Sequence, residues 1–391
     1  MEVRLDFPGD CPGVGARVKG CRMRAASVAP TPMVRTWRED VAAIVGRDLD
    51  WERFAGRRVV VTGAGGFLGG YVARTLLALA ELGKASAPVE VVAPVRSVER
   101  AVLRSPDLAA APGLTFVVWD LNRIAVPDFG DIHYVVHAAS QASPKFYGTD
   151  PVGTALPNAV GTAALLQALQ ASGDPQGFLY VSSGEVYGMT PAGGTVNEHD
   201  FGPLDPLLVR SCYAESKRMG ENLCASWTHQ YGLPTYVVRA FHTYGPGLTE
   251  DDGRVFADFA FNVVRGQDIT MMSDGSARRA FCYASDATAG FFTALLAGAP
   301  GAGYNVGNPS GELSVLELAE LLVGLYPERG LKVVRRVRPE ADGYLPSKVA
   351  ASVPGIEPIN ALGWSPTVTP AEGFRRMIDA YTSVEGAGNG R

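Results

Sequence analysis

The chain has 391 residues, of which 47% are hydrophobic and 19% are charged, and its formal net charge is −5 at pH 7. This length and composition predict one large soluble domain or two closely joined ones. We expect no nucleic-acid partner, because no basic block is present, and no membrane partner, because we find neither a spanning apolar run nor a signal peptide. The five scattered cysteines predict a cytoplasmic protein without disulfides, and no cluster at ligand spacing predicts a metal site.

The sequence divides into five segments. Residues 1–35 lack sustained periodicity, which predicts a disordered N-terminal tail, and 384–391 predict a frayed C-terminal tail. Helical periodicity predicts an N-terminal helix within 36–56. Alternating strand and helix patterns predict one domain at 57–240, and a looser pattern predicts a second region at 241–383 that is interleaved with it.

The first sharp motif is a glycine-rich turn between a predicted strand and a predicted helix. A strand at 57–62 runs into the turn at 63–70 and then into a helix at 71–82. Such a turn lets the backbone approach a pyrophosphate at the helix N-terminus, so this arrangement predicts a dinucleotide site. The residues of the turn that we expect to bind the cofactor are Gly63, Gly66, Phe67, Leu68 and Gly69.

The ends of the next two strands leave the choice between NAD and NADP open. The strand at 89–95 ends without an acidic residue, and Arg96 follows it. An acid there would favour NAD, whereas Arg96 can meet a 2′-phosphate or stack on adenine. A strand at 114–118 is followed by Asp120 and Leu121, and Asp120 is either an acceptor for the adenine amino group or a simple turn residue.

Two further strands alternate with a helix, which predicts a parallel sheet with helices on both faces. A strand and its exit loop at 134–140 precede a helix at 154–171 and a strand at 178–183. Ligands bind at the carboxyl ends of such strands. Small residues at the first exit let a cofactor lie close to the backbone there, namely Ala138, Ala139 and Ser140.

Tyr213 and Lys217 lie four residues apart in a helical pattern, so they share one helix face. A buried ammonium beside a tyrosine lowers the pKa of the phenol from about 10. A phenolate near neutrality can accept a proton from a sugar or alcohol hydroxyl while a hydride leaves the carbon. Alone the pair is a weak signal, because a surface lysine beside a packed tyrosine gives the same pattern.

In this order and on these elements, the motifs resemble the extended short-chain dehydrogenase/reductase family of nucleotide-sugar epimerases, dehydratases and decarboxylases. The resemblance covers about residues 57–380 and includes further motifs at 183–188, 241–246 and 279–286. Within the family, the likeness is strongest to UDP-glucuronate decarboxylases. Four stretches carry that likeness, namely 138–144, 210–213, 252–255 and 275–281.

The resemblance implies an α/β fold with a doubly wound parallel sheet of Rossmann type, in which 57–240 is an NAD(P)-binding domain. It implies that 241–383 is a mainly substrate-binding region, a smaller C-terminal α/β lid that is interleaved with the first domain. It implies that Ser183 hydrogen-bonds the reacting 4-hydroxyl beside Tyr213, and that Glu185 lies next to the sugar ring. Lys217 would also hold the nicotinamide ribose, and Arg279 would clamp the diphosphate. A homodimer formed through the Tyr213 helix is also implied. The other residues that we assign to substrate binding are His242 and Arg254.

Three positions depart from the family pattern. His242 stands where an asparagine near the sugar diphosphate is usual, and Tyr344 lies where a second phosphate-binding arginine is common. Both departures leave the nucleotide and the sugar open. Gly184 replaces the serine or aspartate that usually lies between the hydroxyl residue and the glutamate.

These residues favour one reaction over two alternatives. We expect hydride transfer from sugar C4 to NAD(P)⁺ with Tyr213 as the base. A 4-keto sugar with a carboxylate on C5 is a β-keto acid and loses CO₂ without an added acid. Dehydration needs a base, for which Glu185 is available, and an acid, which Gly184 cannot be. The sequence therefore favours decarboxylation, while 4,6-dehydration, 4-epimerisation and a non-catalytic dinucleotide-binding protein remain open.

Overall fold

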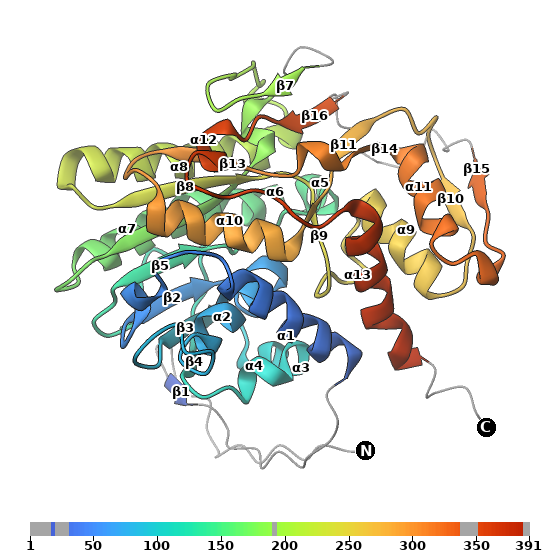
Figure 1. Cartoon of the computed structure of the whole chain (residues 1–391). Helices are drawn as coiled ribbons and strands as arrows, with labels where there is room; N and C mark the ends of the chain where they lie inside the picture. The colour runs from blue at the N-terminus through green and yellow to red at the C-terminus, as the bar shows by residue number, and fades with distance from the viewer. Residues whose placement is uncertain (1–16, 20–30, 190–193, 337–350, 386–391) are drawn as a thin grey trace.

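A computed structural model describes residues 17–19, 31–189, 194–336 and 351–385. An eight-stranded sheet with the order β1-β4-β3-β2-β5-β6-β8-β13 forms its centre (Figure 1). Seven of these strands are parallel, which confirms the predicted doubly wound fold. The parallel strands are β4 (Leu114–Val118), β3 (Glu90–Val95), β2 (Arg58–Thr62), β5 (Tyr134–His137), β6 (Gly177–Ser183), β8 (Thr235–Ala240) and β13 (Gly303–Val306).

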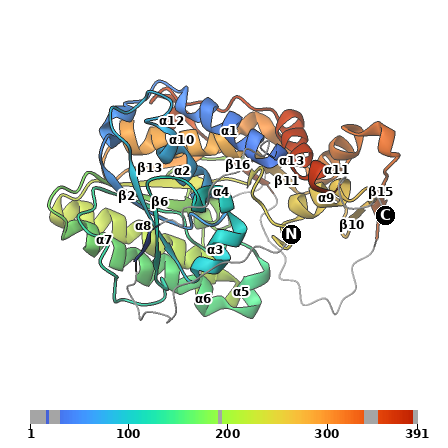
Figure 2. The same ribbon diagram turned by 90° about the horizontal axis from the view of Figure 1, so that it is seen from below.

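Alternate residues of the buried strands face two different helical layers. Val59 and Val61 pack into one apolar cluster, whereas Val60 between them packs into another. The first layer contains α1 (Pro32–Val45), α2 (Phe67–Ala78) and α10 (Ala284–Ala297). The second contains α6 (Pro151–Leu156), the π-helical turn η2 (Pro157–Gly161), α7 (Thr162–Gln170) and α8 (Cys212–Tyr231). Figure 2 shows these layers on opposite sides of the sheet.

The N-terminal elements differ from the prediction. Helix α1 begins at Pro32, because the Thr31 side chain accepts from the Val34 N–H and proline suits the first helical turn. It ends at Val45, and a separate 3₁₀ turn, η1 (Trp51–Phe54), follows. The strand β1 (Arg17–Lys19), which pairs antiparallel with β4, also lies in the segment that we expected to be a tail. Helix α13 (Pro370–Glu385) likewise extends two residues into the predicted C-terminal tail at 384–391. The remaining tail predictions, for 1–16, 20–30 and 386–391, fall outside the described residues.

The C-terminal region forms a smaller α/β unit beside the large sheet. Its core is an apolar cluster between α9 (Val255–Val264), α11 (Val315–Gly324) and α13 (Pro370–Glu385). Two small sheets complete it: β10 (Ile269–Met271) with β15 (Val333–Arg335), and β14 (Glu312–Ser314), β11 (Arg278–Ala280), β16 (Ala351–Pro354) and β7 (Thr195–Val196). The two regions interleave, because β7 comes from within 57–240 and β13 of the large sheet from within 241–383.

Short elements connect these units. They are α3 (Val98–Arg104), α4 (Pro106–Ala109), α5 (Lys145–Thr149), η3 (Gly184–Tyr187), η4 (Val209–Ser211), β9 (Thr243–Tyr244), β12 (Cys282–Tyr283), η5 (Pro309–Gly311), η6 (Pro327–Arg329) and α12 (Glu357–Asn360).

One helical stretch corrects the expectation that no apolar run reaches membrane-spanning length. The 20 residues 151–170, which comprise α6, η2 and α7, are long and apolar enough to cross a membrane by length and composition alone. In the fold 44% of this stretch is buried, and it packs against α8 and the sheet. The core helix of a soluble protein has the same properties, so the stretch is weak evidence for a membrane span.

Candidate active site

The glycine turn fits closely between β2, α2 and the end of β5. Gly63 has φ +74°, and a Cβ there would lie 3.0 Å from the Ala139 nitrogen. A Cβ on Gly69 would lie 2.3 Å from the Gly63 oxygen, so only glycine lets the first turn of α2 pack on the strand end. Gly66 caps α2, whose first N–H groups are donors at a positive helix end. Phe67 and Leu68 begin that helix, so the predicted residues of the turn form one cradle.

The end of β5 forms the wall opposite this cradle. The Ala139 N–H donates to the Thr62 hydroxyl, which also bonds His137 Nδ1 at 2.7 Å. His137 Nε2 lies 3.0 Å from the Pro157 carbonyl oxygen, so both ring nitrogens serve the fold. Burial, followed by the Lys217 charge, lowers the pKa of His137 to about 3. The Ser140 hydroxyl is buried without a hydrogen-bond partner in the described part of the chain, which is consistent with a ligand next to it.

The strands β3 and β4 are neighbours in the sheet, and their carboxyl ends are followed by Arg96 and by Asp120 and Leu121, respectively. These three residues therefore lie at the same edge of the sheet as the glycine turn. Arg96 is exposed. The Asp120 carboxylate accepts from the Asn122 N–H at 3.1 Å, as a turn residue does, and its predicted contact with adenine stays a prediction.

Helix α8 brings three of the predicted catalytic residues together. Tyr213 is 6% exposed and Lys217 is 2% exposed, and the Lys217 ammonium lies 5.8 Å from the centroid of the Tyr213 ring. Lys217 donates to the Val181 carbonyl oxygen at 2.7 Å, which holds it against β6. Ser183 ends that strand and hydrogen-bonds Tyr213. A phenol, a hydroxyl and an ammonium therefore meet at the carboxyl edge of the sheet.

The ionisation of this trio differs from the prediction. Burial, with a smaller effect of the Glu185 charge, raises the pKa of Tyr213 to about 12, although the hydrogen bond to Ser183 and the Arg254 charge oppose it. Burial lowers the pKa of Lys217 to about 7. The predicted lowering of the tyrosine pKa is therefore wrong for the chain alone, because burial outweighs the neighbouring hydrogen bond and cation.

Two residues that the sequence analysis did not single out complete the surroundings of Tyr213. The Tyr147 ring stacks on the Tyr213 ring, with centroids 5.1 Å apart and planes 14° apart. The Arg210 guanidinium lies 5.1 Å from the Tyr147 centroid and pairs with Glu185 at 3.2 Å. Glu185 thus lies beside Tyr213 and is held by an arginine. The residues Tyr147 and Tyr213 are far apart in sequence, so no local pattern predicts their stacking.

The predicted substrate-binding residues lie beyond Tyr213. Arg254 precedes α9 and pairs with both Asp252 oxygens, at 2.6 and 2.8 Å, and its charge acts on Tyr213 and on His242. Arg279 lies on β11 and donates to the Arg278 carbonyl oxygen, and its charge also acts on His242. The two arginines and His242 therefore share one neighbourhood. Tyr344 is outside the described residues.

His242 has an unusual environment between β8 and β9. Its φ is +24°, and it is the one non-glycine residue with positive φ among those that the structure describes. Such a backbone costs on the order of 1–3 kcal/mol. Its Nδ1 atom is buried and no described residue bonds it. Burial, then the charges of Arg279 and Arg254, lowers the pKa of His242 to about 3, so the ring is neutral near pH 7.

Gly184 lies beneath an aromatic ring. A Cβ on Gly184 would meet Cε1, Cζ and Cδ1 of Phe241 at 2.9, 3.0 and 3.1 Å. Phe241 is 2% exposed and packs beside the Tyr187 ring, so it has little freedom to move. The position next to Ser183 therefore has neither an acidic side chain nor room for one. No group of three potential metal ligands occurs within the described ranges.

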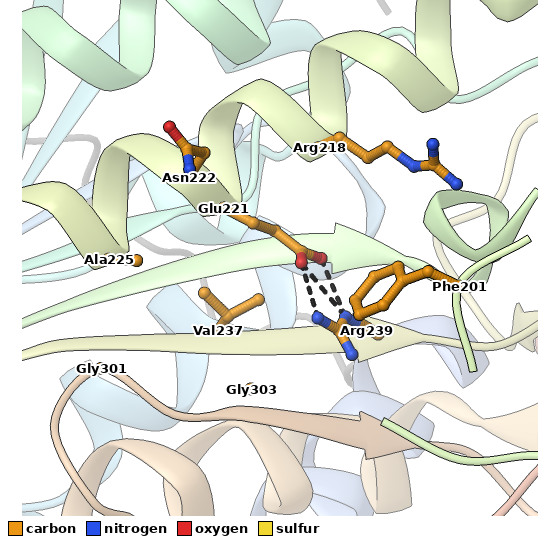
Figure 3. Close-up of a pocket in the computed structure, with 9 residues that line it drawn as sticks. All are labelled: Phe201, Arg218, Glu221, Asn222, Ala225, Val237, Arg239, Gly301 and Gly303. Atoms are coloured by element: carbon orange, nitrogen blue, oxygen red, sulfur yellow. Dashed lines mark hydrogen bonds and ion pairs between the residues drawn. The ribbon is translucent and has the colours of Figure 1, made fainter. Parts of the chain in front are cut away.

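Two pockets in the described part of the chain differ in whether predicted site residues line them. One, of about 280 Å³, lies against α8 and β8, where Arg239 holds both oxygens of Glu221 (Figure 3), and none of the predicted site residues lines it. Since Ser182 also donates to Glu221, this ion pair fixes α8 on β6 and β8. The other pocket, of about 250 Å³, includes Gly66 and Phe67 of the glycine turn.

The sequence model of the NAD-dependent epimerase/dehydratase family matches residues 59–307. The chain belongs to this family. It is 34% identical over 261 residues to UDP-glucuronic acid decarboxylase 6 of Arabidopsis thaliana, covering 66% of this chain and 73% of the relative. It is 30% identical over 262 residues to UDP-glucuronic acid decarboxylase 1 of Danio rerio, covering 67% of this chain and 60% of that relative.

Solved structures show the same fold. A dTDP-glucose 4,6-dehydratase from Streptomyces venezuelae with NAD bound is 25% identical, with a TM-score of 0.70, over 84% of this chain and 98% of that one. A UDP-glucuronic acid 4-epimerase from Bacillus cereus in complex with UDP-glucuronic acid and NAD is 23% identical, with a TM-score of 0.68, over 84% and 99% of the two chains. The second likeness concerns the fold alone.

Proposed function

We propose that this enzyme is an NAD-dependent nucleotide-sugar decarboxylase, which oxidises the sugar at C4 and then releases the C5 carboxylate as CO₂. The observation that carries the proposal is the meeting of Ser183, Tyr213 and Lys217 beside the glycine turn. UDP-glucuronate is the substrate that we favour, because the curated relatives are UDP-glucuronic acid decarboxylases.

The cradle of small residues fits a dinucleotide. The close approach of Gly63 to Ala139 and the unpaired Ser140 hydroxyl are consistent with a cofactor lying against the backbone. In our proposal the diphosphate binds at the N-terminus of α2, the adenosine lies toward Arg96, Asp120 and Leu121, and the nicotinamide end lies toward Ala138 and Ser140. We propose NAD, as in the solved relatives, and NADP is the alternative that Arg96 leaves open. When bound, the dinucleotide supplies a hydride acceptor.

Tyr213 and Ser183 act on the 4-hydroxyl. Ser183 orients the hydroxyl, and Tyr213 takes its proton as the C4–H bond breaks. Because the pKa of Tyr213 is raised to about 12 in the chain alone, the phenolate needs positive charge nearby. Lys217 supplies that charge when it is protonated, and a cationic nicotinamide ring would add to it.

The second step needs little from the protein. A C5 carboxylate beside a C4 ketone loses CO₂ as the C5–C6 electron pair moves toward the ketone oxygen. A proton then adds to C5, and we propose that Glu185, which pairs with Arg210 near Tyr213, relays it. Return of the hydride to C4 would give a UDP-pentose, and without that return the product would be the 4-keto form. Elimination of a C6 hydroxyl would need an acid, and the Phe241 ring fills the space beside Gly184 where one would stand. This favours decarboxylation over 4,6-dehydration. A 4-epimerase would not need the Glu185 carboxylate, which favours decarboxylation over 4-epimerisation.

We also propose a cytoplasmic homodimer in which the C-terminal region covers the substrate. Several apolar side chains near α6 and α8 are exposed: Val152, Leu207, Leu208, Val209 and Met219. The stretch 151–170 is 44% buried in the single chain, and we propose that a second copy of the chain packs against its remaining surface. Light scattering on the purified protein distinguishes a dimer from a monomer.

A mass-spectrometric assay tests the function. Purified protein, NAD⁺ and UDP-glucuronate should give CO₂ and a UDP-pentose or its 4-keto form. An isomer of unchanged mass would mean epimerisation. Absence of turnover with UDP-glucuronate, together with water loss from a UDP-, dTDP- or GDP-hexose, would overturn decarboxylation and make Glu185 an elimination base. A parallel reaction with NADP⁺ decides the cofactor.

A further inference from the structure

The buried ion pair between Glu221 of α8 and Arg239 of β8 lies one helical turn from Lys217. Two Arg239 nitrogens hold both carboxylate oxygens at distances between 2.7 and 3.2 Å (Figure 3), and the Ser182 hydroxyl donates to the same carboxylate at 2.5 Å. The side chains of Arg239 and Glu221 are only 8% and 12% exposed. Because residues four apart share a helix face, these donors fix the Glu221 carboxylate on the side of α8 that carries Lys217.

Glu221 is the charged neighbour that acts on Lys217. The Lys217 ammonium lies 4.8 Å from the centroid of the Tyr180 ring of β6, and its charge acts on His137 of β5. Burial raises the pKa of Tyr180 and of Tyr213 and lowers that of His137 to about 3, so these three groups are neutral near pH 7 in the chain alone. Burial also lowers the pKa of Lys217 to about 7, and the Glu221 charge opposes that decrease. Glu221 therefore favours the ammonium form of Lys217.

The ion pair has a second set of contacts, which link it to η3. An Arg239 nitrogen donates to the Tyr187 hydroxyl at 2.9 Å, and Tyr187 ends the turn η3, which begins next to Ser183. The other titratable side chains around the pair are Glu198, Arg218 and Cys224. Removing either Glu221 or Arg239 leaves these side chains in place and breaks the same ion pair, yet it changes the charge near Lys217 in opposite directions.

We propose that Glu221 is a positioning residue, whose carboxylate keeps the Lys217 side chain positively charged beside Tyr213. Arg239 holds this carboxylate and partly balances its charge, which limits its effect on Lys217. The inference rests on the proposed function, in which the Lys217 ammonium stabilises the Tyr213 phenolate and activity falls once Lys217 loses its proton. Glu221 itself contacts neither the substrate nor the cofactor in this account, and it acts through Lys217.

NMR of the protein labelled with ¹³C at the lysine Cε atoms follows the proton on Lys217 directly and needs neither substrate nor cofactor. The quantity measured is the titration midpoint, which is the pH at which half of the Lys217 side chains have lost their proton. The chain has six lysines, and Lys217→Met identifies the signal of interest. The other five are Lys19, Lys84, Lys145, Lys332 and Lys348.

Two variants of the ion pair should move this midpoint in opposite directions. Glu221→Gln removes the negative charge and should lower the midpoint by about 0.5–1 pH unit. Arg239→Met leaves that charge unbalanced and should raise the midpoint by a similar amount. In single-turnover reduction of NAD⁺ with UDP-glucuronate, the pH above which activity falls should move with the midpoint in each variant. Glu215→Gln is the matched control, because Glu215 lies on another face of α8 and pairs with Arg218, and it should leave both quantities unchanged.

Opposite shifts separate a charge effect from a structural one. A purely structural role of the ion pair would lower activity in both variants without moving the two midpoints in opposite directions. Shifts of the same sign, midpoints that agree with the wild type within about 0.2 pH unit, or an activity profile that does not follow the midpoint would overturn the inference.

A double variant covers the case in which a single variant does not fold. Glu221→Gln with Arg239→Met leaves no buried ion unpaired. Its midpoint should still lie below that of the wild type, because the charge that acts on Lys217 is that of Glu221, and an unchanged midpoint would overturn the inference. If the wild type turns over no nucleotide sugar, the proposed function fails, whereas opposite shifts of the midpoint would still support the action of Glu221 on Lys217.

Discussion

Replacing Lys217 with methionine should stabilise the protein near neutral pH while removing its activity. Burial lowers the pKa of Lys217 from 10.5 to about 7, and at 1.36 kcal/mol for each pKa unit this corresponds to about 5 kcal/mol. Methionine has a similar length and no charge. It also loses the hydrogen bond to the Val181 carbonyl oxygen, which is left unpaired at a cost of about 1–3 kcal/mol. The expected net gain in free energy of unfolding is therefore about 2–4 kcal/mol at pH 7.

The sign of this effect depends on pH. Between about pH 7 and 10.5 the unfolded chain binds a proton on Lys217 that the folded chain does not, so the stability of the wild type rises with pH over this window. The advantage of Lys217→Met should therefore shrink toward about pH 10. Urea unfolding at pH 7 and at about pH 10 measures the difference in free energy of unfolding between the variant and the wild type. Lys84→Met, at an exposed lysine, is the matched control. A variant that is less stable than the wild type at pH 7, or whose advantage does not change with pH, would refute the reasoning.

Three further predictions follow from the site and its supports. Tyr213→Phe should fold normally and lose about 10²–10⁴-fold in single-turnover formation of reduced cofactor, and near-normal turnover would exclude Tyr213 as the base. Asp40 of α1 is buried and accepts from Tyr71 of α2 at 2.7 Å and from Arg376 of α13 at 2.8 Å, and burial raises its pKa to about 6. The folded protein therefore holds a proton there between about pH 4 and 6, so wild-type stability should fall relative to Asp40→Asn by about 3 kcal/mol as pH rises through this window. A stability difference in denaturant unfolding that is independent of pH would contradict this. Gly184→Ala should lower the free energy of unfolding by about 1–3 kcal/mol, because its Cβ would contact Phe241, and Phe241→Leu should reduce that loss in a double-mutant cycle. Additive changes in the free energy of unfolding would show that the ring does not block this position.

Local sequence patterns were sufficient for the parts of the fold that repeat along the chain. The strand, glycine turn and helix around Gly63 follow from a fixed spacing, and so does the shared helix face of Tyr213 and Lys217. Helix boundaries were less accurate where capping decides them. The side chain of Thr31 starts α1 earlier than its apolar periodicity suggests, and the π-helical turn at Pro157–Gly161 divides a helix that the periodicity predicts as continuous.

The surroundings of the predicted residues depend on contacts between distant segments. The Tyr147 ring on Tyr213 and the Arg210 partner of Glu185 come from separate elements, and no local pattern signals either contact. The same holds for the direction of the Tyr213 pKa, because the extent of burial is a property of the whole fold. His242 could be flagged as an unusual residue from its sequence, but its strained backbone and unpaired nitrogen required the structure.

The central claim is that oxidation at C4 leads to loss of the C5 carboxylate. The most direct measurement uses UDP-glucuronate with an isotopic label on its carboxylate carbon, and follows labelled CO₂ and the sugar product together. The account predicts that labelled CO₂ and a UDP-pentose or UDP-4-keto-pentose appear in equal amounts, and that Tyr213→Phe forms both about 10²–10⁴-fold more slowly. Retention of the label in a UDP-hexuronate with altered C4 configuration would contradict it and make the enzyme an epimerase.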